Sequence, residues 1–78
     1  MARLRLFASL RVAAGTGRTE VAGATVGEVV DAACARYGAE FAGLVQHCRI
    51  WCNGQPALPS DPVGDGDEVA ILPPVSGG

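Results

Sequence analysis

The chain has 78 residues, of which 49% are hydrophobic and 18% charged, and its formal net charge is −2. This length allows one domain with a small core, and the hydrophobic fraction excludes a disordered chain. No apolar run approaches the roughly 20 residues that cross a bilayer, and six dispersed arginines within an acidic chain disfavour a nucleic-acid-binding face.

The N-terminal residues predict two strands joined by a short helical turn. Residues 3–8 alternate strictly, residues 10–14 fit a helical turn, 15–17 supply turn residues, and 18–22 are rich in β-branched side chains. In the first strand we expect Leu4, Leu6 and Ala8 to point inward and Arg3, Arg5 and Phe7 outward. This alternating pattern differs from the continuous apolar segment of a signal peptide, so we expect a cytoplasmic protein.

A single substantial helix follows. Thr25 and Glu28 form a capping box, and Gly38 stands where a helix C-cap belongs. Apolar residues recur between them at helical spacing: Val26, Val29, Val30, Ala33, Cys34 and Tyr37. Residues 40–46 fit another short helical turn.

The last third predicts a hairpin and a final strand. Alternating residues flank Asn53-Gly54, which is a strong hairpin signal, and Asp65-Gly66 leads into a strand ending at Leu72. Pro73 and Pro74 lack the N–H donors of a strand ladder, so the sheet ends before them.

These elements predict a two-layer α+β domain. One main helix covers one face of a mixed sheet of four to five strands, with the first and last strands parallel at the centre. This is the β-grasp, or ubiquitin-like, arrangement. We expect residues 1–72 to form this domain and residues 73–78 a flexible C-terminal diglycine tail.

The strand parity places three large apolar side chains, Phe7, Trp51 and Leu72, on the sheet face away from the helix. Scattered surface hydrophobes are ordinary, but a patch formed by these three would serve as a contact surface for protein partners. The acids Asp61, Asp65, Asp67 and Glu68, with the terminal carboxylate, predict a negative C-terminal end and a basic partner surface there.

The sequence ends in Gly77-Gly78, which suits a tail that enters another protein. Residues without a Cβ fit a narrow channel, and the Gly78 carboxylate is unhindered. Chance and a frayed end are competing explanations. The chain offers no means of activating a carboxylate, since it has no P-loop and only a lone His47. Its three cysteines include no CxxC pair, which disfavours a zinc site. We predict a protein acted upon, with no catalytic role by itself.

The run DPVGDGDEVAILPPVSGG at residues 61–78 closely resembles the end of molybdopterin synthase small subunits, which are ubiquitin-like sulfur carriers. The likeness extends through LRLFASLRVAAGT at residues 4–16, the capped helix and the hairpin. Diglycine is shared by all ubiquitin-like carriers, whereas Pro-Pro-Val-Ser-Gly-Gly is more similar to the molybdopterin type than to the thiamine type.

The resemblance implies a mechanism. A ubiquitin-activating-like adenylyltransferase would use ATP and Mg²⁺ to adenylate Gly78, and a sulfur donor of the cysteine desulfurase or rhodanese type would convert it to a thiocarboxylate. The molybdopterin synthase large subunit would then receive the tail, and sulfur would pass to cyclic pyranopterin monophosphate. No cofactor bound to the chain, no metal and no membrane is implied.

The resemblance also assigns residues. Gly77 and Gly78 carry the chemistry, and Phe7 and Leu72 occupy positions where the family has an apolar contact surface. We expect Trp51 and the tail residues Pro73, Pro74, Val75 and Ser76 to share that partner interface. Two alternatives stay open: a related carrier for thiamine, cysteine or tRNA thiolation, and a β-grasp interaction module in which the diglycine has no role.

Overall fold

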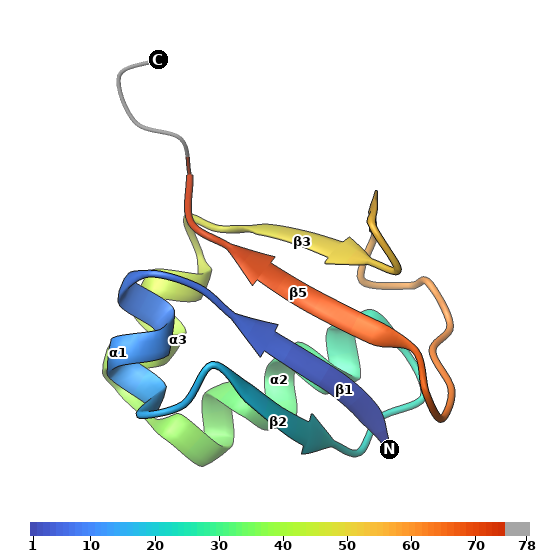
Figure 1. Ribbon diagram of the computed structural model, residues 1–78, viewed down its shortest axis with the longest axis horizontal. Coiled ribbons are helices and arrows are strands. Elements are labelled where there is room, and N and C mark those ends of the chain that lie inside the picture. Colours follow the sequence, from blue (N-terminus) through green and yellow to red (C-terminus); the bar gives the residue numbers. More distant parts are fainter. Residues whose placement is uncertain (75–78) are drawn as a thin grey trace.

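The computed structural model of the protein describes residues 1–74. Figure 1 shows a sheet with its helices gathered on one side. In chain order the elements are β1 (Ala2–Leu6), α1 (Ser9–Ala14), β2 (Arg18–Val21), α2 (Val26–Tyr37), α3 (Ala39–Val45), β3 (Arg49–Cys52), β4 (Gln55–Pro56) and β5 (Glu68–Leu72).

The predicted first strand is correct except at its end. Leu4 and Leu6 are buried, and Arg3 is exposed on the other face. Ala8, which we expected to point inward, is exposed and has a φ of 52°. The chain leaves the sheet after Leu6 and turns directly into α1, so the alternation of side chains stops before Ala8.

The predicted capping box begins α2. Thr25 Oγ1 accepts a hydrogen bond of 3.2 Å from the Glu28 N–H. Glu28 Oε1 accepts one of 2.9 Å from the Ala24 N–H, one residue before the N-cap. At the other end the Gly38 N–H bonds the Cys34 carbonyl at 3.0 Å, and the φ of Gly38 is 97°, a conformation that favours glycine.

Helix α3 contributes more to the core than its sequence indicated. Phe41 is fully buried and is the largest such side chain among the described residues. Its ring lies 5.1 Å from that of Tyr37 on α2, at a tilt of 52°. Because only one aromatic residue of this helix faces inward, hydropathy periodicity over seven residues gave a weak signal.

The Asn53-Gly54 hairpin joins β3 to β4 as predicted. Both residues have positive φ angles, 51° and 81°, as a two-residue type I′ turn requires. Asn53 also ties this turn to the start of β5. Its Oδ1 accepts a 2.9 Å hydrogen bond from the Glu68 N–H, and its own N–H donates to the Glu68 carbonyl at 2.8 Å.

The sheet has the strand order β2-β1-β5-β3-β4. β1 and β5 are parallel at its centre, and the other pairs are antiparallel. The predicted α+β, β-grasp fold with a mixed sheet is therefore confirmed, with α1 and α3 added to the main helix α2. Figure 1 shows the arrowheads of β1 and β5 pointing to the same end of the molecule.

The core lies between the sheet and its helices. Leu4 and Leu6 of β1 and Val69 and Ile71 of β5 are almost wholly buried beneath these helices. Their burial fixes the register of the two central strands, because a slip of one residue would expose all four side chains. Within residues 1–74, no helix has the length and hydropathy needed to span a membrane.

Candidate functional site

The predicted tail begins at the end of a central strand. β5 is hydrogen-bonded to β1 on one side and β3 on the other, and its last residue, Leu72, pairs with Arg49. Pro73 is half-buried and Pro74 exposed. The remaining predicted site residues, Val75, Ser76, Gly77 and Gly78, lie outside the described residues. The base of the tail is thus held by two neighbouring strands.

Phe7, Trp51 and Leu72 lie near one another on the outer sheet face. Leu6 pairs with Ile71, so Phe7 and Leu72 follow at the same end of two adjacent parallel strands. Trp51 pairs with Ala70, two residues before Leu72. Each of the three is half-buried. Their use as a partner contact surface stays a prediction.

An arginine partly covers this apolar group. The guanidinium carbon of Arg5 lies 5.4 Å from the centre of the Phe7 ring, a cation–π distance. Arg5 lies directly opposite Arg18 across β1 and β2. The arginines are dispersed along the sequence, but the pairing of β1 with β2 brings Arg5 and Arg18 together. The strand register between residues 2–5 and 18–21 was the signal that would have revealed this pair.

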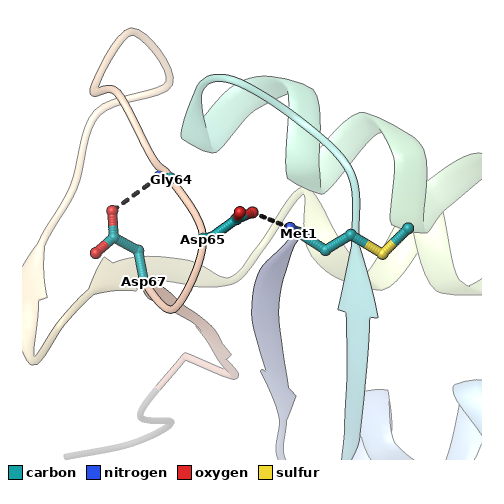
Figure 2. Close-up of polar contacts among 4 residues, drawn as sticks. All are labelled: Met1, Gly64, Asp65 and Asp67. Atoms are coloured by element: carbon teal, nitrogen blue, oxygen red, sulfur yellow. Dashed lines mark hydrogen bonds and ion pairs between the residues drawn. The ribbon is translucent and has the colours of Figure 1, made fainter.

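Asp65 and Asp67 lie in the loop before β5, at the end of that strand opposite the tail. Figure 2 shows their polar contacts. Asp65 pairs with the Met1 amine, and Asp67 Oδ2 accepts a 2.8 Å hydrogen bond from the Gly64 N–H. β5 then carries the chain about 16 Å away before Pro73. The expectation that these acids lie beside the tail is wrong, because the length of β5 separates residues that are close in sequence. The charge of the partner surface stays a prediction.

Asp65 and the terminal amine predict a pH window of added stability. The hydrogen bond between them raises the amine pKa from its ordinary value of 8.0 and lowers the pKa of Asp65 from 3.8. The contribution of this ion pair to stability is complete between the two ordinary pKa values, 3.8 and 8.0. It is lost as pH falls through the lowered carboxyl pKa or rises through the raised amine pKa. Both groups are exposed, so the effect is small.

We expect Asp65→Asn to lower the melting temperature slightly at neutral pH. The difference from the original chain should vanish at acidic pH, where the carboxyl is protonated, and at alkaline pH, where the amine is neutral. Thermal unfolding followed by circular dichroism across pH measures this. Glu40→Gln, on the exposed surface of α3, is the control. A difference that is independent of pH would contradict the ion pair as its cause.

The thiols and the histidine lie in settings that do not favour catalysis. Burial raises the pKa of Cys34, Cys48 and Cys52 from the ordinary 9.0, so each thiol is protonated at neutral pH. Cys48 Sγ donates to the Leu44 carbonyl at 3.1 Å. His47 is exposed in the turn between α3 and β3. None of these groups is arranged as an activated nucleophile.

Comparison with known proteins agrees with the fold. The sequence matches the ThiS family over residues 4–78. It is 38% identical to small archaeal modifier protein 1 of Haloferax volcanii, covering 95% of this chain and 97% of that one. The crystal structure of that protein superposes with a TM-score of 0.80, covering 99% and 98% of the two chains at 34% identity.

Two further solved structures are similar over nearly the whole chain. One is a chain of the BexX/CysO complex of Amycolatopsis orientalis, 28% identical, with a TM-score of 0.83 and full coverage of both chains. The other is a Pyrococcus furiosus protein assigned as subunit 1 of a molybdopterin converting factor, 25% identical, with a TM-score of 0.83 and coverage of 95% and 97%. With its β-grasp fold and diglycine sequence, this chain belongs to the ThiS family of ubiquitin-like sulfur-carrier and modifier proteins.

Proposed function

We propose that this protein is the sulfur-carrying small subunit of a molybdopterin synthase, working in the cytoplasm. The observation that carries the proposal is the sequence Pro-Pro-Val-Ser-Gly-Gly directly after the central strand β5. Support comes from the likeness to the Pyrococcus furiosus subunit, which matches in fold and over almost its whole length.

The fold suits the delivery of a carboxylate. β5 is fixed between β1 and β3, so the point where the tail leaves the domain is defined. Pro73 and Pro74 have restricted φ angles, which stiffens the first part of the tail. Four residues follow, and fully extended they reach about 13 Å farther. This length would let Gly78 reach into a partner protein.

Activation of Gly78 requires a second protein. An adenylyltransferase of the ubiquitin-activating type would join the Gly78 carboxylate to AMP, using ATP and Mg²⁺, and release pyrophosphate. The persulfide of a sulfur donor of the cysteine desulfurase or rhodanese type would then displace AMP and form an acyl disulfide. A second thiol of the partner proteins would reduce this bond, release the thiocarboxylate and itself become part of a disulfide. The chain contributes an accessible carboxyl group and bare glycines, which leave room for these reactions.

The synthase large subunit is the proposed recipient of the charged tail. Phe7, Trp51 and Leu72 form the contact surface, because they lie together on the outer sheet face beside the base of the tail. Sulfur would pass from Gly78 to cyclic pyranopterin monophosphate, and water would hydrolyse the acyl–sulfur bond and restore the Gly78 carboxylate.

Reconstitution tests the destination of the sulfur. The thiocarboxylated chain is mixed with a molybdopterin synthase large subunit and the pterin precursor, and dithiolene formation is followed by conversion to a fluorescent pterin derivative. We expect product to form, and Phe7→Arg to slow it at low carrier concentration without loss of fold. Thiocarboxylate that forms but yields no dithiolene would refute the molybdopterin assignment and favour a carrier for another pathway.

A second candidate function is protein modification. The 38% identity to small archaeal modifier protein 1 favours it, since that relative is named as a modifier. In this case the activated Gly78 carboxyl would be transferred to an amine of another protein. Incubation of the activated chain with a lysine-rich acceptor separates the two candidates, because a carrier passes on sulfur and is released, whereas a modifier stays attached.

A further inference from the structure

Two arginines repel one another on the outer sheet face. Arg5 and Arg18 are directly opposite partners in the antiparallel pair of β1 and β2. Like charges in such positions destabilise a sheet. Glu68 lies 3.9 Å from Arg5, and Arg18 has no ion pair within 4.0 Å among residues 1–74. Within the described part of the chain, the repulsion between Arg5 and Arg18 is thus offset only by the long Arg5–Glu68 ion pair.

A third arginine reaches the same place from α1. A hollow of about 410 Å³ is lined by Arg5, Arg11 and Arg18, with Phe7 and Gly17 among its other walls, and no acidic residue lines it. A Cβ at Gly17 would lie 3.3 Å from Arg11 Cδ, so the stem of Arg11 packs over bare backbone. We name this surface the arginine hollow. Three arginines thus line one hollow, and the guanidinium of one of them, Arg5, lies over the Phe7 ring.

The arginine hollow lies next to the base of the tail. Phe7, which forms one wall, follows the last residue of β1, and β1 ends beside the end of β5. The loop acids Asp65 and Asp67 lie at the opposite end of β5 (Figure 2). The surface near the base of the tail therefore carries clustered arginines, although the whole chain has a net charge of −2.

We propose that the arginine hollow docks a carboxylate-rich segment of the enzyme that activates the tail. Carboxylates match the planar donors of arginine and would also relieve the repulsion between Arg5 and Arg18. The activating enzyme is the partner that both candidate functions share, since a carrier and a modifier each need an activated Gly78. The proposal rests on the proposed function only through that activation step.

Calorimetric titration of the full chain with the adenylyltransferase of the same organism tests this docking. We expect Arg11→Ser and Arg18→Ser each to raise Kd about tenfold, and high salt to reduce the difference. Arg3→Ser is the matched control, because Arg3 is on the same sheet face but does not line the hollow. Arg18→Lys should recover part of the affinity, and Arg18→Ser should not lower the melting temperature.

The outcomes are separable. Undetectable binding of the original chain, or equal Kd values for the hollow variants and Arg3→Ser, would overturn the docking proposal even if Gly78 acquires sulfur. Selective weakening in the hollow variants would support docking even if Gly78 never acquires sulfur, and that result would refute the proposed function alone. The same titration is repeated with a single-stranded RNA oligonucleotide. If the chain binds the RNA but not the enzyme, and this binding depends on Arg11 and Arg18, the docking proposal is overturned.

Discussion

Replacing Phe41 with alanine is expected to lower the free energy of unfolding by about 3 to 5 kcal/mol. The Phe41 ring is fully buried and packs against Tyr37, so its removal loses apolar burial and leaves a cavity. A domain of 78 residues has modest stability, and this loss is a large part of the total. Urea denaturation followed by circular dichroism measures the change.

A matched control keeps this result specific to the core. Val12→Ala removes an apolar side chain that is 83% exposed, and it should change the stability by no more than about 0.5 kcal/mol. Phe41→Leu keeps most of the buried volume and should lie between the two, which provides a measurement if Phe41→Ala fails to fold. Equal stability of Phe41→Ala and Val12→Ala would show that α3 does not pack as described.

Deletion of Gly77 and Gly78 is expected to abolish thiocarboxylate formation completely. The shortened chain still ends in a carboxylate, but that group sits on a residue with a side chain and reaches about 7 Å less far. It can neither enter a channel shaped for glycine nor meet the activating site. Mass spectrometry of the chain after incubation with ATP, the activating enzyme and a sulfur donor detects replacement of one oxygen by sulfur.

The deletion should leave the folded domain unaffected. Its melting temperature is expected to match that of the full chain. Gly43→Ala serves as the glycine control, since a Cβ at this position meets no atom within 4 Å, and it should acquire sulfur normally. Sulfur incorporation into the shortened chain at the rate of the full chain would refute a carrier function for the diglycine.

Local signals were sufficient for most of the elements. Thr25 and Glu28 cap the start of α2, as expected, and Asn53-Gly54 forms the expected hairpin turn. These motifs act through hydrogen bonds and φ angles within a few residues, so the sequence around them contains the whole interaction. The end of the first strand was less predictable, because the turn at Ala8 depends on where α1 packs.

In the candidate site, too, the features that depend on local sequence could be predicted, and those that depend on tertiary structure could not. Gly77 and Gly78 and the prolines before them could be read from the sequence, since their use depends on their own backbone properties. The location of charge could not. Asp65 and Asp67 are near the tail in sequence and at the far end of β5 in space, while Arg5 and Arg18 are thirteen residues apart and face one another.

The sequence alone determined the fold class, the strand order along the chain and the diglycine ending, because periodicity, capping and turn chemistry are local. Only the tertiary structure decided that Phe41 fills the core and that Arg5, Arg11 and Arg18 line one hollow together with Phe7. These features depend on strand register and helix packing, and a shift of one residue in register would move each side chain to the other face of the sheet.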